Sequence, residues 1–386
     1  MNDSFLNLPF FESHHHQLFN DLDAWSTKNI VPSAHEDVDT TCQNLVQQLG
    51  KDGWLKSTVS GKQFGGTFDT IDTRTICLSR EILAYHEGLA DFSFAMQGLG
   101  SGAISIAGSP SQQFTYLPDV VSGKKIAAFA LSEPHAGSDV AAMQCQATEK
   151  EEYAIIDGEK TWISNGGIAN FYIVFAREPN SMGTKGISAW IVDSNTTGLE
   201  IAERINVIAP HPLARLKFNQ CKVPLSQRIG GAGEGFKIAM RTLDVFRTSV
   251  AAAALGFAKR AFDEALAHAK QRQMFGQHLA DFQITQTKLA NMATSIDSAA
   301  LLIYRAAWLR DQGNTITKEA AMAKLTATEE AQLVIDQALQ MFGGQGVVSG
   351  HIVEKLYRDI RALRIYEGAS EVQQLIIARE LLKKPT

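Results

Sequence analysis

The chain has 386 residues, of which 45% are hydrophobic and 20% are charged, and its formal net charge is -5. This composition is typical of a globular protein with a large core, which excludes disordered and collagen-like chains. No run of five or six like charges occurs, so the basic surface of a nucleic-acid-binding protein is not expected. No apolar run reaches the roughly 18 residues of a membrane span, and we expect no membrane segment.

The cysteine and charge patterns indicate in which cellular compartment the protein is expected. The four cysteines lie far apart without a C-x-x-C pair, which argues against a zinc site and a secreted disulfide scaffold, and no metal is expected. Only acidic charges precede Lys28, the opposite of a basic signal or transit peptide. We therefore expect a cytoplasmic protein, or a mitochondrial-matrix protein if the source is eukaryotic.

Residues 1–125 are predicted to form a helical N-terminal domain. Apolar residues between 10 and 123 mostly follow helical spacing, interrupted by loops of small residues such as 98–102. His14, His15 and His16 lie in an amphipathic stretch, and we interpret them as a solvated helix face. The histidines therefore predict neither a tag nor a metal site.

Residues 126–232 are predicted to form a middle β domain. Segments 153–156, 171–175, 187–192 and 216–223 are short and rich in β-branched and aromatic residues. Turn signals such as Asp157-Gly158 separate them. This alternation indicates a compact β structure.

Residues 233–386 are predicted to form a helical bundle domain. No proline occurs between Pro224 and Pro385, so nothing of that kind interrupts long helices here. One stripe has apolar residues spaced by three and four, as in a bundle helix, and Gly313 is placed to end that helix. The stripe consists of Leu289, Met292, Ile296, Ala299, Ile303 and Ala306.

Familiar nucleotide and hydrolase motifs are missing. The sequence contains no G-x-G-x-x-G, no G-x-x-x-x-G-K-[ST], no G-x-S-x-G and no H-E-x-x-H. Any nucleotide must therefore be held in another way.

Residues 131–139 (LSEPHAGSD) form a loop whose amides and hydroxyls can donate to an anionic or polar ring, although a plain inter-domain turn has the same composition. Residues 160–167 (KTWISNGG) follow, and a Trp within a strand is most often part of the core.

These two segments, together with 272–276 (RQMFG), 340–346 (QMFGGQG) and 365–371 (IYEGASE), resemble the signatures of the acyl-CoA dehydrogenase family. They occur in the family's order and spacing, and the resemblance covers nearly the whole chain. It implies an α+β multidomain fold with a helical N-terminal domain, a β-barrel middle domain and a C-terminal four-helix bundle.

The resemblance also implies FAD, bound without a covalent link between the middle and C-terminal domains and partly by a neighbouring subunit. At least a dimer is then required, and the family is usually tetrameric. Ser164 is expected near flavin N5, and the arginine fork of Arg272 suits pyrophosphate, although a solvent-exposed helix charge is the alternative. The implied FAD-binding residues are Phe129, Leu131, Ser132, Gly137, Ser138, Trp162, Ile163, Ser164, Arg272, Phe275, Gln283, Gln340, Met341, Gly343, Gly344, Ala369 and Glu371.

Glu367 is the expected catalytic base. Dehydrogenation across the Cα–Cβ bond of a thioester needs a base for the α-proton, and burial should raise the pKa of this carboxyl toward working pH. The alternative is an exposed glutamate before a helix-capping glycine. Some family members carry the base just before the arginine matched here by Arg247, but this chain has Phe246 there. The implied substrate-binding residues are Ser138, Asp244, Arg247, Tyr366 and Gly368; Asp244 and Arg247 could instead form a helix surface pair.

The leading hypothesis is an FAD-dependent acyl-CoA dehydrogenase that makes a trans-2-enoyl-CoA and passes electrons to an electron-transfer flavoprotein. An acyl-CoA oxidase and a dehydrogenase of carrier-protein-bound acyl groups remain alternatives on the same fold. A non-catalytic flavin-binding protein is the remote alternative. Ala369 lacks the hydroxyl that many relatives carry, which removes one possible flavin contact.

Overall fold

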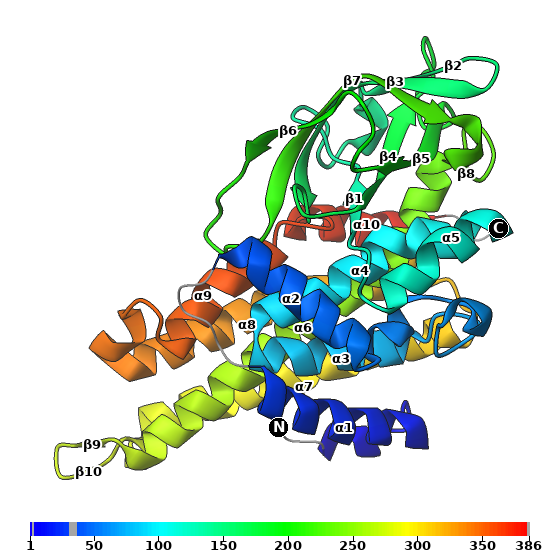
Figure 1. Ribbon diagram of the computed structural model, residues 1–386. Coiled ribbons are helices and arrows are strands. Elements are labelled where there is room, and N and C mark those ends of the chain that lie inside the picture. Colours follow the sequence, from blue (N-terminus) through cyan, green and yellow to red (C-terminus); the bar gives the residue numbers. More distant parts are fainter. Residues whose placement is uncertain (2–3, 31–36, 384–386) are drawn as a thin grey trace. The chain divides into compact units, whose positions relative to one another are not determined.

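The computed structural model describes residue 1 and residues 4–30 and 37–383 (Figure 1). Along the chain, helices are followed by strands and then by helices again, so the predicted order is confirmed. Two compact units are formed, each from separate stretches of sequence. The helical unit comprises Met1–His35, Thr73–Asp91 and Arg247–Thr386, and the sheet unit comprises Glu36–Asp72 and Phe92–Phe246. The predicted boundaries at residues 125 and 232 stay predictions.

The helical unit is built around α8, which packs against α7, α9 and α10, while α3 packs against α1 and α7. Two long helices belong to it only in part, namely the start of α4 (Gly88–Ala107) and most of α6 (Gly235–Gln271). Its other elements are η1 (Ser4–Asn7), α1 (Ser13–Asn29), α3 (Thr73–His86), β9 (Gln273–Met274), β10 (Gln277–His278), η6 (Leu279–Asp281), α7 (Gln283–Asp311), α8 (Thr317–Phe342), η7 (Gly343–Val347), α9 (Ile352–Leu363) and α10 (Ser370–Leu382).

The predicted stripe lies on α7. Five of its six residues are buried and Leu289 is half-buried, as expected when one face of a helix enters a bundle core. Gly313 has a φ of +83°, directly after the C-cap of α7. This left-handed conformation is easily adopted by glycine and ends the helix where the sequence predicts it.

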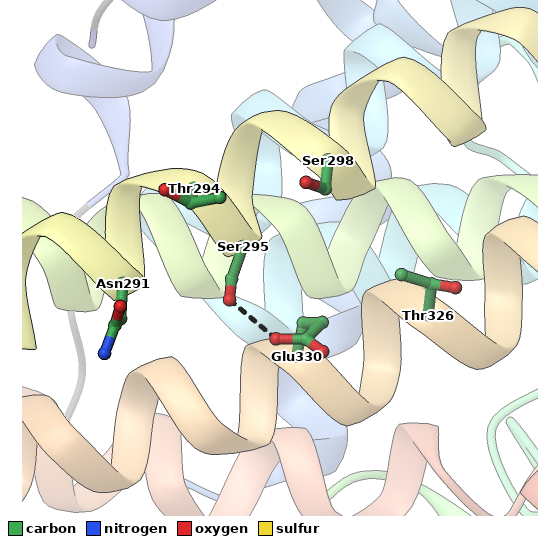
Figure 2. A pocket seen from close by; sticks show the side chains of 6 residues that line it. All are labelled: Asn291, Thr294, Ser295, Ser298, Thr326 and Glu330. Atoms are coloured by element: carbon green, nitrogen blue, oxygen red, sulfur yellow. Dashed lines mark hydrogen bonds between the residues drawn. The ribbon is translucent and has the colours of Figure 1, made fainter.

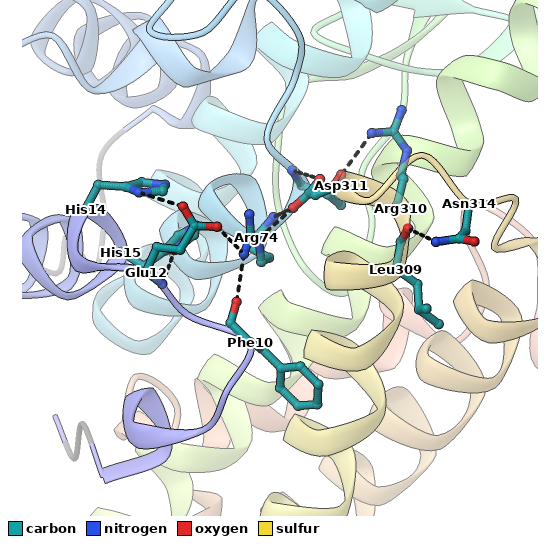
Figure 3. A network of polar contacts seen from close by, with 10 residues as sticks. Phe10, Glu12, His14, His15, Arg74, Leu309, Arg310, Asp311 and Asn314 are labelled. Carbon is teal, nitrogen blue, oxygen red and sulfur yellow. Dashed lines mark hydrogen bonds and ion pairs between the residues drawn. The ribbon is translucent and has the colours of Figure 1, made fainter.

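A polar network ties the N-terminal segment to α3 and α7 (Figure 3). Arg74 Nε donates to Asp311 Oδ2 at 2.9 Å, Arg74 Nη1 donates to the Phe10 carbonyl at 2.8 Å, and Arg74 also forms an ion pair with Glu12 at 2.9 Å.

The prediction that the three histidines form a solvated helix face is wrong for His15. Its side chain is buried, and its Nδ1 accepts the Glu12 N–H at 3.0 Å in the capping box of α1.

The close approach of α6 to α3 at Gly256 gives a stability prediction. A Cβ at this position would lie 2.2 Å from the Glu81 carbonyl oxygen. We expect Gly256→Val to lower the free energy of unfolding by roughly 1–3 kcal/mol, because the two backbones must separate. Urea unfolding followed by circular dichroism measures this change, and an unchanged midpoint would mean that the helices have room to move apart.

The sheet unit contains one eight-stranded sheet in the order β6-β7-β3-β2-β4-β5-β8, with β1 paired to β4. β4 pairs in parallel with β1 and β2, and the other neighbours are antiparallel. The strands are β1 (Ala127–Ala130), β2 (Gln146–Glu149), β3 (Tyr153–Ser164), β4 (Phe171–Arg177), β5 (Ile187–Asp193), β6 (Leu199–Arg204), β7 (Leu213–Pro224) and β8 (Arg228–Ile229). All four segments predicted as β lie within these strands.

Helices cover this sheet and complete its core. The helical elements of the unit are α2 (Val38–Lys51), η2 (Trp54–Thr58), η3 (Lys62–Phe64), α5 (Pro110–Val121), η4 (Val140–Ala142), η5 (Leu225–Gln227), most of α4 and the start of α6. Phe171, Ile173 and Phe175 of β4 form one apolar cluster with Tyr116 and Leu117 of α5. Alternate residues of a strand face one side, so β4 presents this row to the helices.

No helix in the described part of the chain is long and apolar enough to cross a membrane.

Candidate functional site

The two predicted segments of the sheet unit meet in space. The Thr161 N–H donates to the Ser132 carbonyl at 2.9 Å, and Lys160 Nζ donates to the Leu131 carbonyl at 3.0 Å. The structure therefore brings the loop that follows β1 against the end of β3. Ser132 and Trp162, one from each segment, are therefore close to each other along these two paired stretches of backbone.

A buried ion pair joins these segments from inside. Lys160 Nζ lies 2.7 Å from Glu133 Oε1, and both side chains are buried. Glu133 also accepts the backbone N–H groups of Gln144 at 2.6 Å and Cys145 at 3.0 Å. Sequence reasoning missed both charged residues. Opposite charges were visible in the two predicted segments, since 131–139 contains Glu133 and Asp139 and 160–167 contains Lys160, but nothing in the sequence indicates which acidic residue pairs with Lys160.

Trp162 is not a core residue. The pairing of β3 with β7 shifts register between Lys160 and Ile163, so Thr161 and Trp162 form a bulge. Trp162 has a φ of +59°, and its side chain is 58% exposed, while Ile163 is buried. The bulge thus turns a flat aromatic ring outward. Ser164 ends β3 and is half-buried.

The loop at residues 131–139 offers polar groups at its surface. Glu133 and Ala136 exchange backbone hydrogen bonds of 3.2 and 3.1 Å across a tight turn. Beyond this turn, Gly137 and Ser138 are exposed. Leu131 is buried and Phe129 and Ser132 are half-buried, so apolar side chains anchor the loop while hydroxyl and amide donors stay accessible.

In the helical unit, the predicted phosphate and adenosine contacts lie at helix ends. Arg272 lies between α6 and β9, and Phe275 lies in the β9–β10 turn, where it has a φ of +50° and is 88% exposed. His268 stacks on Phe342 with ring centroids 4.2 Å apart, which places the end of α6 beside the end of α8. Gln340 and Met341 lie in the last turn of α8, Gly343 and Gly344 follow the helix, and Gln283 begins α7; all except half-buried Met341 are exposed.

Glu367 lies in the turn between α9 and α10. It has a φ of +52°, and Gly368 follows with a φ of +96°. Non-glycine residues rarely adopt this conformation, and such strain is concentrated at functional sites. Oε2 of Glu367 is shielded from solvent and has no hydrogen-bond partner among the described residues. A buried acceptor without a donor is costly, so the turn holds a carboxylate that can accept a hydrogen bond or a proton from a bound molecule.

Charged neighbours surround this carboxylate. Burial raises the pKa of Glu367 above its ordinary value, and the positive charges of Arg80, Arg247 and Lys324 oppose that rise, while Asp91 adds to it. Burial also raises the pKa of the adjacent Tyr366. Sequence reasoning located Glu367, but it missed Arg80, Asp91 and Lys324.

Arg80 and Asp91 form a two-point ion pair next to this turn. Arg80 Nε and Nη2 donate to the two Asp91 oxygens at 2.7 and 2.9 Å, and Arg80 Nη1 donates to Ser249 Oγ at 3.0 Å. Both charged side chains are buried. Two parallel hydrogen bonds fix a guanidinium firmly, so Arg80 is a rigid charge near Glu367.

The remaining predicted residues are placed as follows. Arg247 is buried, which disfavours the alternative of an exposed helix pair, and Asp244 is half-buried in the sheet unit. Ala369 is the N-cap residue of α10, and Glu371 is exposed in its first turn. Negative charge in a first turn is favourable for the helix, which gives Glu371 a structural reason of its own.

A pocket of about 340 Å³ lies between α7 and α8 (Figure 2). Polar side chains line it, and Ser295 Oγ donates to Glu330 Oε2 at 2.6 Å across it. None of the predicted site residues lines this pocket. The lining residues are Asn291, Thr294, Ser295, Ser298, Thr326 and Glu330.

Models of the acyl-CoA dehydrogenase family match the chain as its N-terminal domain over residues 12–124, its middle domain over 128–221 and its C-terminal domain over 233–382. The chain is 38% identical over 382 residues to 3-(aryl)acrylate reductase of Clostridium sporogenes, covering 97% of this chain and 100% of the relative.

Two further proteins are similar. The caffeyl-CoA reductase-Etf complex subunit CarC of Acetobacterium woodii is 37% identical over 345 residues, covering 89% of this chain and 90% of the relative. The solved butyryl-CoA dehydrogenase from Megasphaera elsdenii has a TM-score of 0.91 and 32% identity, covering 99% of this chain and 100% of that structure. These matches confirm the resemblance and the fold predicted from five short segments.

Proposed function

Because the chain belongs to the acyl-CoA dehydrogenase family, whose members are FAD-dependent oxidoreductases acting on CH–CH bonds, we propose that it dehydrogenates an acyl-CoA thioester to the trans-2-enoyl-CoA. The α-proton leaves to Glu367, and the β-hydrogen leaves as hydride to the flavin. The observation that carries this proposal is the buried, unpartnered Oε2 of Glu367 in a turn of positive φ.

Glu367 has the properties of a general base. A base works best when its pKa lies near the working pH, and burial moves the pKa of this carboxyl upward from the ordinary range of a glutamate. The Glu367 N–H donates no hydrogen bond to a carbonyl of the described residues. That N–H is thus available to polarise the thioester oxygen, which increases the acidity of the α-proton.

The cofactor is FAD, and the polar and aromatic groups at the surface of the chain suit it, some exposed and some half-buried. Ser132, Ser138 and Ser164 supply hydroxyls, and Trp162 supplies an aromatic face, in the sheet unit. In the helical unit, Arg272 is exposed and suits the pyrophosphate. When bound, FAD supplies the acceptor for the hydride. We propose the remaining implied contacts, namely Phe129, Leu131, Gly137, Ile163, Phe275, Gln283, Gln340, Met341, Gly343, Gly344, Ala369 and Glu371, as neighbours of the same cofactor.

Ser138, Asp244, Arg247, Tyr366 and Gly368 are proposed to bind the substrate. The burial of Arg247 and its influence on the pKa of Glu367 support a place for it beside the reacting carbons.

We propose a homo-oligomer, at least a dimer and by the family pattern a tetramer. The support is the β9–β10 turn, where Phe275 is 88% exposed and has a φ of +50°. A bulky residue rarely adopts this conformation, and such strain is concentrated at functional sites, which is consistent with contacts to a neighbouring subunit there. The cytoplasmic location stays a prediction from the sequence.

An electron-transfer flavoprotein is the proposed redox partner. The similarity to the CarC subunit of a caffeyl-CoA reductase-Etf complex supports it. Two of the similar relatives are named reductases, which favours the reverse reaction as a second candidate function. In that direction Glu367 returns a proton to Cα, since the same group must act in both directions.

An anaerobic panel tests the function. We expect one straight, branched or aryl acyl-CoA to bleach the flavin absorbance of the purified protein, and the matching enoyl-CoA to re-oxidise the reduced flavin. The ratio of the two rates shows which direction is favoured. Peroxide formation in air would identify the oxidase alternative, and bleaching only by a carrier-bound thioester would identify the carrier-protein alternative. A flavin that no thioester bleaches would overturn the proposal.

A further inference from the structure

We propose that Lys324 is a positioning residue for the Glu367 base, because its ammonium group fixes the turn that carries Glu367 and its positive charge acts on that carboxylate. This inference rests on the proposed function, since it needs Glu367 to be the base. It adds Lys324, a residue of α8 that lies outside every predicted site segment.

Lys324 is deeply buried, with none of its surface exposed. Its Nζ donates to the Gly368 carbonyl at 2.8 Å. Within residues 4–30 and 37–383, no carboxylate forms an ion pair with it within 4.0 Å. A buried ammonium without a close counter-ion is costly, so its presence calls for a compensating role.

The carbonyl that Lys324 holds is shared with a second buried donor. Gln373 Nε2 donates to the Gly368 carbonyl at 2.8 Å and to the Glu367 carbonyl at 3.3 Å. Gln373 and Lys324 come from α10 and α8, so two helices hold one turn. Two successive residues of that turn have positive φ, and such a conformation persists only where its surroundings fix it.

The charge of Lys324 reaches Glu367. Burial lowers the pKa of Lys324 to about 8, and the carboxylate of Glu367 is the strongest influence that opposes this fall. Arg80 is paired at two points with Asp91, which offsets part of its charge. The charged groups that act on Lys324 are Glu367, Arg247, Glu329 and Glu371, and those that act on Glu367 are Arg80, Arg247, Lys324 and Asp91.

A purely structural lysine and a positioning lysine differ in one observable. The base is active only when deprotonated, so the rate of flavin reduction rises with pH through the pKa of Glu367. An opposite charge nearby lowers that pKa, and its removal raises it. Loss of Lys324 must therefore move the acidic limb of the pH profile to higher pH, whereas loss of a neutral hydrogen bond need not.

The test compares Lys324→Met with Gln373→Met in the FAD-loaded protein. The second variant removes a donor to the same carbonyl without changing any charge. We expect Lys324→Met to shift the acidic limb of anaerobic flavin reduction upward by about 1 pH unit or more. We expect Gln373→Met to slow reduction without shifting that limb. An unshifted limb in Lys324→Met, or an equal shift in both variants, would overturn the proposal.

Folding and the proposed function are controlled separately. Lys324→Gln removes the charge but keeps an amide donor, so it carries the same pH test if Lys324→Met does not accumulate as folded protein. The infrared carboxyl band that is present in the starting protein and lost in Glu367→Gln gives a direct titration of Glu367 against pH in either background. If Glu367→Gln still reduces flavin at the normal rate, the proposed function fails; if only the Lys324 shift is missing, this inference alone fails.

Discussion

Replacement of Glu367 by glutamine is expected to slow anaerobic flavin reduction by the best acyl-CoA by about 10²- to 10⁴-fold. Glutamine has nearly the same shape but cannot accept the α-proton. The FAD content should be unchanged, because Glu367 is not among the proposed flavin contacts. Stopped-flow absorbance measures the rate, and the visible spectrum of the purified variant measures the flavin.

A matched control lies on the following helix. Glu380 is a carboxylate of α10 that pairs with Lys383 near the surface, with Nζ 2.6 Å from Oε1. Glu380→Gln should reduce flavin at the rate of the starting protein. Equal slowing in both variants would indicate a general electrostatic effect, and an unaffected Glu367→Gln would place the base elsewhere.

The second large effect is expected from Lys160→Met. This change leaves the Glu133 carboxylate buried and without its partner, which at such sites costs about 3–5 kcal/mol of unfolding free energy. The backbone N–H groups of Gln144 and Cys145 still donate hydrogen bonds to the Glu133 carboxylate and hold it in place, so this side chain cannot turn out to solvent. Equilibrium urea unfolding of the FAD-loaded protein is the measurement.

An exposed ion pair in the same unit provides the comparison. Lys62 lies 3.9 Å from Asp69, and both side chains are more than half exposed. Lys62→Met should change stability by less than about 1 kcal/mol. If Lys160→Met is no more damaging than Lys62→Met, the ion pair between segments 131–139 and 160–167 is not what holds them together.

Local sequence patterns were sufficient to predict several of the regular elements. The stripe on α7 follows from helical spacing, because one face of the helix is buried and side chains recur on it every three or four residues. The four β segments follow from their β-branched and aromatic content and the turn signals between them. Trp162 shows the limit of that reasoning. The residues around Trp162 predict a strand with the Trp side chain in the core, but a bulge in the pairing of β3 with β7 turns the ring outward. No pattern within one strand indicates where its partner shifts register.

The candidate site likewise has a part that a local sequence segment predicts and a part that it does not. The short segment around Glu367 was enough to locate the proposed base. Its electrostatic surroundings come from Arg80, Asp91 and Lys324, which lie far from it in the sequence and adjoin it only after folding. Glu133 and Lys160 likewise pair across two segments. Tertiary contacts of this kind cannot be predicted from one segment, because the two partners are separated in the sequence and meet only in the folded chain.

The central claim is that Glu367 removes the α-proton of an acyl-CoA. Anaerobic incubation of the protein in D₂O with the acyl-CoA that bleaches its flavin, followed by mass spectrometry of the recovered thioester, tests it most directly. Deuterium should enter the α-carbon with the starting protein and not with FAD-loaded Glu367→Gln. Incorporation at equal rates with both proteins, or none with the starting protein, would contradict the claim.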